Sequence, residues 1–237
     1  MTIRAYHGAN YLVNDYYYLT LFGIFAMKKM SVFAGATGAR CVMEDVKARK
    51  SQIRQSAFVR RDALSKDERS KKSTAIMERL FDFANFLEAR LVLFYMSYGS
   101  EVDTEPMVRK ALELEKIVAL PLVDAKQREI VPFKIDNLDS DIRPGYRGIR
   151  EPIPEQCKQI PIQYVNLAII PGVAFDERGG RIGHGMGVYD RFIPKLDITT
   201  RKVALAFECQ IVPQIPMEPH DRYTDIIITE ERIIYKI

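Results

Sequence analysis

The chain has 237 residues, of which 47% are hydrophobic and 28% are charged, and its formal net charge at pH 7 is +4. This length and apolar share allow a sizeable core in one large domain or two small ones. The three cysteines lie far apart without a C-x-x-C spacing and the three histidines are scattered, which argues against a disulfide framework and a zinc site. Cysteines of this kind are typical of a reducing compartment, so we expect a cytoplasmic protein.

The charge is unevenly distributed along the chain. Residues 1–43 carry a net charge of +3, which leaves +1 for residues 44–237. The bulk charge of the larger part therefore gives no reason to expect a nucleic-acid partner. We interpret residues 1–43 as an N-terminal extension that is disordered or spurious, with translation beginning near Met27, Met30 or Met43. Residues 44–237 are predicted to form a single domain.

The segment Tyr11–Met27 is aromatic and apolar, and two other interpretations of it were weighed. A membrane-spanning helix needs about 20 apolar residues, and Asn14 and Asp15 leave a shorter run. A signal peptide has a basic start, whereas only Arg4 precedes this segment, although small residues that vaguely resemble a cleavage site follow it. We therefore expect no association with a membrane.

Helical patterns follow one another from residue 44. The stretch Glu44–Ala63 is highly charged with a thin apolar stripe. A capping box, Ser65–Glu68, opens a second helix whose apolar face continues to Leu87. Thr104 is a suitable N-cap for a third helix, Glu105–Glu115. An apolar run, Arg90–Met96, separates the second of these helices from the third.

The apolar runs have the length of buried strands. One of them contains Pro132, which predicts an edge strand, and residues 136–161, rich in proline and glycine, are predicted to be a long loop with little regular structure. Strands alternating with helices predict an α/β fold, a mostly parallel open sheet with helices on both faces in three α/β/α layers. The predicted strands are Arg90–Met96, Lys116–Val123, Arg128–Ile135, Asn166–Gly172, Arg201–Phe207 and Thr224–Thr229.

Ligands of such folds bind beyond the carboxyl ends of the strands. The loop Ser97–Thr104 follows the first predicted strand, and Val173–Gly187 follows the strand at Asn166–Gly172. An acidic stretch, Glu218–Asp225, lies just before the last predicted strand. These loops are the candidate positions for a functional site.

The second loop contains a run of five glycines within nine positions, Gly179–Gly187. The run is neither G-x-G-x-x-G nor a P-loop. Its G-x-G-x-G part, between a strand and a helix predicted from about Gly187 to Pro194, can still present backbone N–H groups to an anion. Arg181 and Arg191 flank it and can pair with phosphate oxygens. A flexible surface turn without a ligand is the alternative.

Asp190 lies three positions after the last glycine of this run. A carboxylate beside a phosphate site is unfavourable unless a cation lies between them, which indicates Mg²⁺, with Asp221 as a second ligand. The alternatives are an acid in the first turn of a helix for Asp190 and a turn or cap residue for Asp221.

The sequence PGVAFDERGGRIGHGMGVYDRF, residues 171–192, resembles the conserved segment of the 5-formyltetrahydrofolate cyclo-ligase family, PG-x-x-F-D-x-x-G-x-R-L-G-x-G-x-G-Y-Y-D. The resemblance covers residues 46–237. Other motifs occur in the same order as in the family: K-x-x-x-R, S-E-V-D-T, GI-x-EP, A-L-A-F, Q-I-x-x-x-I-P and H-D-x-x-x-D. The chain departs from the pattern at Val188, where the family usually has an aromatic residue.

The resemblance implies an enzyme that uses ATP and Mg²⁺ to close the ring of 5-formyltetrahydrofolate, giving 5,10-methenyltetrahydrofolate, ADP and phosphate. Its partners would be ATP and a reduced folate, and we expect a monomer. The residues it implies are, for catalysis, Arg181, Gly185, Gly187 and Tyr189; for ATP, Lys50, Arg54, Arg181, Ile182, Gly183, His184, Gly185, Met186, Gly187, Val188 and Tyr189; for the folate, Met96, Glu101, His184 and Val188; and for the metal, Asp190 and Asp221.

Phosphoryl transfer depends on positioning and charge stabilisation, so it needs no protein nucleophile. This agrees with the absence of a G-x-S-x-G or other nucleophile motif from the sequence. Two alternatives stay open. One is an inactive homologue that binds a nucleotide or RNA, favoured by Val188 and by the basic helix Lys47–Arg61. The other is a kinase or ligase acting on a different small substrate.

Overall fold

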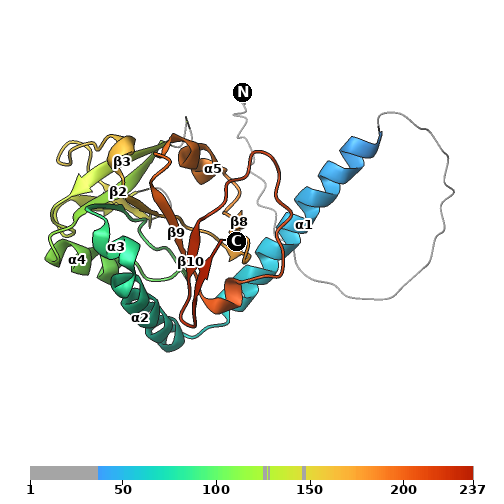
Figure 1. Cartoon of the computed structure of the whole chain (residues 1–237), viewed down its shortest axis with the longest axis horizontal. Helices are drawn as coiled ribbons and strands as arrows, with labels where there is room; N and C mark the ends of the chain where they lie inside the picture. Colours follow the sequence, from blue (N-terminus) through green and yellow to red (C-terminus); the bar gives the residue numbers. More distant parts are fainter. Residues whose placement is uncertain (1–36, 125–126, 128, 146–147, 237) are drawn as a thin grey trace, which may run out of the picture. The chain divides into compact units, whose positions relative to one another are not determined.

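A computed structural model describes residues 37–124, 127, 129–145 and 148–236. Its centre is a seven-stranded sheet, seen with its helices in Figure 1. The strands of this sheet are β1 (Leu91–Leu93), β2 (Ile117–Asp124), β3 (Glu129–Ile135), β6 (Leu167–Ile169), β9 (Arg201–Leu205), β10 (Ile226–Ile228) and β11 (Ile233–Tyr235).

The strand order is β11-β10-β9-β6-β1-β2-β3. The neighbours β2, β1, β6, β9 and β10 are parallel, whereas the edge strands β3 and β11 are antiparallel to the strands beside them. Strand order runs outwards from β1 in one direction to β2 and from β6 in the other to β9. The crevice at the carboxyl ends of β1 and β6 is therefore the topological switch point, where open α/β sheets bind ligands.

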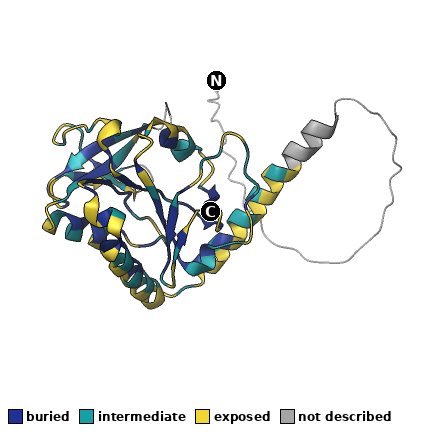
Figure 2. Cartoon of the chain, in the orientation of Figure 1, coloured by how far each residue is buried: buried dark blue, intermediate teal, exposed yellow. Residues whose placement is uncertain are grey.

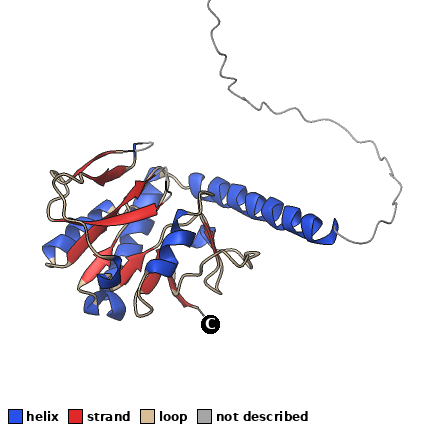
Figure 3. Ribbon diagram, turned by 90° about the horizontal axis from the view of Figure 1, so that it is seen from above, coloured by secondary structure: helices blue, strands red, loops and turns tan. Residues whose placement is uncertain are grey.

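Helices cover both faces of the sheet (Figure 3). Residues of α2, α3 and α4 pack with one face in a cluster that includes Val92 of β1, while α5 packs with the other face and with Leu91 and Leu93. Because successive side chains of a strand point to opposite faces, these neighbours separate into two cores. The mostly parallel, three-layer prediction is confirmed. The helices are α1 (Thr37–Asp62), α2 (Lys66–Asp82), α3 (Ala84–Glu88), α4 (Glu105–Glu113) and α5 (Val188–Phe192).

From residue 45 onwards, where its burial is described, α1 is mostly exposed and contacts the rest of its unit through a narrow stripe (Figure 2). Ala57 is fully buried on this stripe against Val173, Ala174 and Ile182. Basic side chains surround the small buried patch, so docking of α1 depends on polar contacts as well as on burial. Lys50, Arg54 and Arg61 make such contacts with the loops around the switch point, and Arg60 makes one with Cys209 O after β9.

The predicted capping box is confirmed, since Ser65 and Glu68 each bond the backbone N–H of the other. The predicted continuous helix to Leu87 is wrong. Phe83 has φ −75° and ψ 124°, so it ends α2 and begins α3, and its side chain is buried. The turn rotates the following residues, and Leu87 is 60% exposed.

Thr104 precedes α4 as predicted, but its hydroxyl does not cap the helix. It donates to Tyr95 O at 2.7 Å and accepts from Ser97 N at 3.0 Å. Thr104 therefore fastens the chain after β1 to the start of α4, which fixes the loop between them.

The long loop predicted at residues 136–161 contains regular structure. A hairpin of β4 (Ile142–Pro144) and β5 (Arg150–Pro152) lies within it, and Phe133 of β3 makes a bridge to Gln159. Short strands with proline carry little sequence signal, which explains the error. The antiparallel strand β11 and a second hairpin, β7 (Ala174–Phe175) with β8 (Arg181–Ile182), were likewise not predicted.

Residues 1–36, with most of the predicted N-terminal extension, lie outside the described residues, so its interpretation and the domain boundary at residue 43 remain predictions. Residues 39–237 form one compact unit. Among the described residues, no helix has both the length and the apolar character to cross a bilayer.

Candidate functional site

Four segments meet at the carboxyl ends of β1 and β6. The loop after β1 meets the glycine loop where Glu101 Oε1 lies 3.5 Å from His184 Nε2. The start of α5 meets the acidic stretch where Arg222 N donates to Asp190 Oδ1 at 3.2 Å. Helix α1 joins them through Arg54, whose Nε donates to Gly183 O at 2.9 Å. The predicted loops and the basic helix therefore form one site.

The glycine loop takes backbone conformations that its glycines permit. Gly185 has φ 100° and Gly187 has φ 63°, both in the left-handed region that other residues rarely adopt. Gly187 is the N-cap of α5, which has only five residues. Such a short helix adds little dipole, so anion binding here depends on the loop's own N–H groups and on nearby arginines.

Arg181 lies beneath this loop and is almost completely buried. Its Nη1 donates to Pro171 O at 3.2 Å and its Nη2 to Asp190 Oδ1 at 2.7 Å. Its guanidinium carbon lies 6.0 Å from the centre of the Tyr189 ring. Among the described residues its Nε has no acceptor. A buried donor left unpaired costs free energy unless a ligand or water satisfies it.

The acidic stretch holds a group of possible metal ligands, in which Glu218, His220 and Asp221 offer atoms within 4.8 Å of one another. Asp190 is not a member of this group, although Arg222 N links it to the same stretch. Carboxylate oxygens are the ligands that Mg²⁺ prefers, so Asp221 and Glu218 fit it by chemistry.

Lys50 of α1 lies on these carboxylates. Its Nζ is 2.5 Å from Glu218 Oε2 and 2.5 Å from Asp221 Oδ2. Burial lowers the pKa of Lys50, but hydrogen bonds and charges from the two acids outweigh it and raise that pKa overall. The ammonium therefore neutralises the acids that a divalent cation would bind, and either the lysine moves or the cation shares them.

Glu101 lies deep in the site, with its side chain 9% exposed. Burial raises its pKa, while a hydrogen bond from Tyr98 N and the charge of Arg61 lower it. Burial also raises the pKa of the Tyr95 and Tyr189 hydroxyls, and the charge of Glu101 adds to both shifts. Burial is therefore the main cause of all three raised pKa values, and the Glu101 carboxylate can accept hydrogen bonds from a polar ligand.

Two predicted folate residues have packing roles in this structure. Met96 is 6% exposed and belongs to the core beneath α2, α3 and α4. Val188 is half-buried and packs on the opposite core with Tyr189. The remaining residues predicted in the glycine run, from Ile182 to Met186, lie on β8 and the loop after it, where Met186 O accepts from Arg191 Nη2 at 2.9 Å.

Sequence reasoning missed Arg61, Phe58 and Glu218. Arg61 lies seven positions after Arg54, on the same side of α1, and its Nε donates to Ser100 Oγ at 2.9 Å. A helical plot of the basic residues could have singled it out. Nothing in the residue pattern distinguishes Glu218 from other loop acids.

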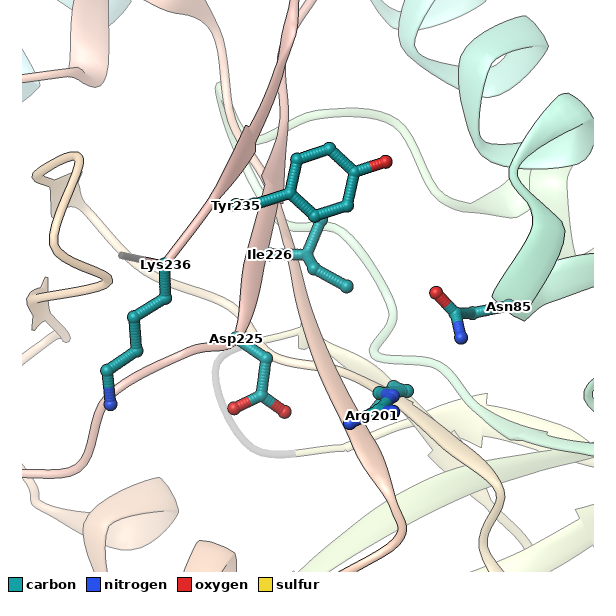
Figure 4. Close-up of a pocket in the computed structure, with 6 residues that line it drawn as sticks. All are labelled: Asn85, Arg201, Asp225, Ile226, Tyr235 and Lys236. Atoms are coloured by element: carbon teal, nitrogen blue, oxygen red, sulfur yellow. The ribbon is translucent and has the colours of Figure 1, made fainter.

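A cavity of about 340 Å³ lies away from these residues, at the amino ends of β9 and β10 (Figure 4). No predicted site residue lines it, and Asp225 on its wall already accepts from Lys202 N at 2.9 Å. Its lining residues are Asn85, Arg201, Asp225, Ile226, Tyr235 and Lys236.

The fold and these contacts define an α/β protein whose glycine loop, buried arginines and carboxylates meet at the topological switch point, where open α/β sheets bind ligands. The chain belongs to the 5-formyltetrahydrofolate cyclo-ligase family, whose sequence pattern matches residues 46–230.

Individual relatives agree. A probable 5-formyltetrahydrofolate cyclo-ligase of Caenorhabditis elegans is 31% identical over 207 residues, covering 81% of this chain and 98% of the relative. The 5-formyltetrahydrofolate cyclo-ligase of Escherichia coli K12 is 28% identical over 182 residues, covering 73% and 96%. The solved structure of Aquifex aeolicus 5,10-methenyltetrahydrofolate synthetase has a TM-score of 0.71 at 29% identity, covering 79% of this chain and 92% of that one.

Proposed function

We propose that this protein is an ATP-dependent cyclo-ligase that converts 5-formyltetrahydrofolate to 5,10-methenyltetrahydrofolate. The observation that carries the proposal is the meeting of the glycine loop, the basic stripe of α1 and the buried Glu101 at one switch point, in a chain of this family. Such a site has room for two functions, phosphate binding at the glycine loop and recognition of a polar ring at Glu101.

The reaction is limited by a poor leaving group, because a formamide oxygen does not depart and its carbon resists attack by an amine. Transfer of the γ-phosphoryl group of ATP to that oxygen releases ADP and makes the oxygen part of a phosphate. The neighbouring nitrogen then bonds to the same carbon, loses its proton, and the phosphate leaves. Positioning and charge stabilisation suffice for the first step.

We assign the phosphates of ATP to the run from Arg181 to Tyr189, with Lys50 and Arg54 as further contacts from α1. Arg54 already orders the loop through Gly183 O. Arg181 is held by Pro171 O and Asp190, and its unpaired Nε leaves a donor for an anion. Charged donors fixed in a dry site stabilise developing charge without reorganising.

We assign the pterin ring of the folate to Glu101, whose oxygens face His184 and Tyr98 N rather than a salt-bridging arginine. An ionised carboxylate accepts hydrogen bonds from ring N–H and amino groups. Met96 and Val188 support this pocket by packing. His184 stands at the boundary between the folate and the phosphate regions.

A bound Mg²⁺ would neutralise part of the charge of the phosphates. Asp221 and Glu218 are suited to hold it, with Asp190 nearby through Arg222 N. We expect Asp190→Asn to lower turnover by about 10²-fold, the scale for losing one transition-state charge partner. Wild-type turnover of this variant at saturating Mg²⁺ would remove Asp190 from the site.

The inactive alternative is supported in the sequence by Val188 and by the basic helix Lys47–Arg61. Val188 packs against the second core, while Lys50, Arg54 and Arg61 bond to groups of the same unit. None of these contacts favours that alternative. The expectations of a monomer, of a cytoplasmic location and of no nucleic-acid partner remain predictions.

The decisive experiment incubates the purified chain with ATP, Mg²⁺ and 5-formyltetrahydrofolate and follows the ultraviolet absorbance of the methenyl product. Product formation that requires ATP supports the proposal. Absence of product from folded protein, together with RNA retention that falls steeply with salt, would favour the inactive alternative. A panel of other small acceptors tests the second alternative, a kinase or ligase for a different substrate. ATP-dependent product from one of them, without product from the folate, would favour it.

A further inference from the structure

Arg61 is a buried charge that the proposed reaction does not use. It is 4% exposed, lies at the end of α1, and its guanidinium carbon is 5.1 Å from the centre of the Phe58 ring. Among the described residues its Nη1 has no hydrogen-bond partner, and its one ion pair is a 4.0 Å contact with the neighbouring Asp62. Burial of a charge with so few partners is costly, so it needs a reason.

The contacts of Arg61 belong to a network that starts and ends on α1. Its Nε donates to Ser100 Oγ at 2.9 Å, and Ser100 precedes Glu101 in the loop after β1. Glu101 Oε1 lies 3.5 Å from His184, whose ring centre is 5.9 Å from that of Phe58. This network of contacts joins α1, the loop after β1 and the glycine loop. Ser100 also donates to Asp62, which fixes its hydroxyl on the Arg61 side.

Arg61 acts on Glu101 through its charge and leaves the carboxylate oxygens to other partners. No Arg61 nitrogen forms a salt bridge with the Glu101 carboxylate within the part of the chain described here, although the charge of Arg61 acts on that carboxylate. One Glu101 oxygen accepts from Tyr98 N at 3.0 Å and the other faces His184. The carboxylate thus receives electrostatic support while keeping lone pairs for a ligand. A direct bidentate arginine would consume them.

We propose that Arg61 is a positioning residue: it fastens the Ser100–Glu101 turn to α1 and supplies the positive charge that sustains the carboxylate recognising the reduced folate. The assignment of the folate rests on the proposed function, whereas the effect of Arg61 on Glu101 does not. The groups facing Glu101 are Arg61 from α1, Tyr95 after β1, His184 from the glycine loop and Tyr189 from α5.

The first test measures Glu101 itself. The carboxyl carbons of glutamate are labelled with ¹³C, the Glu101 signal is assigned by its loss in Glu101→Gln, and it is titrated in the ligand-free full chain. Because the positive charge of Arg61 lowers the pKa of Glu101, Arg61→Gln should raise the Glu101 midpoint. Arg61→Lys should keep most of the charge and shift it little. An unchanged midpoint in Arg61→Gln would overturn the proposal.

Arg60 provides the matched control, because it neighbours Arg61, is exposed, and docks α1 through a 2.7 Å bond from its Nε to Cys209 O. Arg60→Gln should leave the Glu101 midpoint unchanged. A histidine near Glu101 can change charge during the titration and alter the Glu101 signal. The titration is therefore repeated with His184→Asn, which removes that group. If Arg60→Gln shifts the midpoint as much as Arg61→Gln, the effect comes from docking of α1 and the proposal is wrong.

The second test measures binding of 5-formyltetrahydrofolate by calorimetry without ATP. Because binding needs the ionised carboxylate, the loss of binding on acidification should move to higher pH in Arg61→Gln, by as much as the Glu101 midpoint rises. Ser100→Ala, which keeps the charge but frees the turn, should weaken binding at every pH and carries the test if Arg61→Gln does not fold. Wild-type binding by Ser100→Ala would overturn the fastening role. A shifted Glu101 midpoint without folate binding by the wild type would contradict only the proposed function.

Discussion

The two ends of the parallel strands treat polar groups differently. At the amino ends, Asn166 Oδ1 accepts from Arg90 N and Leu91 N, and Thr200 donates to Val165 O. At the carboxyl ends, Arg61 Nη1 and Arg181 Nε, the buried side-chain atoms without partners among the described residues, lie with the partly buried Glu101. The amino ends close the fold, whereas the carboxyl ends retain hydrogen-bonding capacity for ligands.

The cavity of about 340 Å³ at the amino ends sharpens this contrast (Figure 4). Asp225 on its wall is paired with both the backbone N–H and the ammonium of Lys202. Asp225 is therefore already paired on this wall and offers a ligand little new hydrogen bonding. Buried donors without a partner among the described residues therefore lie at the candidate site, whereas the cavity does not.

The largest effect is expected at Arg181, on the carboxyl side. Arg181→Lys keeps a charge but loses the fork that joins Pro171 O and Asp190, so turnover should fall by about 10²- to 10³-fold. The measurement is single-turnover formation of the methenyl product. Arg201→Lys, on the amino side, should react like the wild type. Equal losses in both variants would abolish the distinction between the two ends.

A smaller effect is expected at Arg54, which acts on the same side through the glycine loop. Arg54→Ala removes the bond to Gly183 O and a positive charge, so the KM for ATP should rise about tenfold, as a loss of about 1.4 kcal/mol implies. Turnover at saturating ATP should change less. Arg49→Ala, an exposed position on the same helix, is the control. An unchanged KM for ATP would make Arg54 a solvated surface residue.

At the amino ends, a change should affect stability and spare catalysis. Asn166→Ala leaves Arg90 N and Leu91 N without their acceptor and should lower the free energy of unfolding by about 1 kcal/mol. Asn166→Asp retains an acceptor oxygen and should lose less. Urea denaturation with parallel steady-state assays checks both. A raised KM with unchanged stability would contradict the structural role of this end.

The smallest effect is expected at Glu101 and has the opposite sign. Burial raises the folded-state pKa of Glu101, so its ionisation costs stability as the pH rises from the unfolded value of about 4.3 through the folded value. Glu101→Gln should therefore be more stable than the wild type at pH 7, and the difference should vanish below the unfolded value. Denaturation at both pH values measures this. Lower stability of the variant at pH 7 would mean that the carboxylate is not strained.

Local chemistry made parts of the structure predictable. The capping box at Ser65–Glu68 is a short-range pattern, and the apolar runs of the central strands can hardly lie anywhere but in a buried sheet. The break at Phe83 and the hairpin β4–β5 escaped prediction because neither has a strong local pattern. The chain turns at Phe83, whose ring is buried in the core, and that burial depends on residues far apart along the sequence.

The candidate site was predicted in composition but not in arrangement. The glycine run, Asp190 and Asp221 stood out by residue type and by likeness to the family segment, whereas Lys50 on Asp221 and Arg181 on Asp190 became visible only as contacts. Arg61 looked like one basic residue among several on α1. Its burial depends on the loop after β1, thirty-nine positions away at Ser100.

The sequence by itself determined the α/β class, the strands that are buried on both faces and the glycine loop, because these depend on residue patterns within a few positions. Only the tertiary structure decided which charged groups are paired and which buried donors have no partner among the described residues. That decision depends on burial and on partners far apart along the chain, as with Arg61 and Ser100.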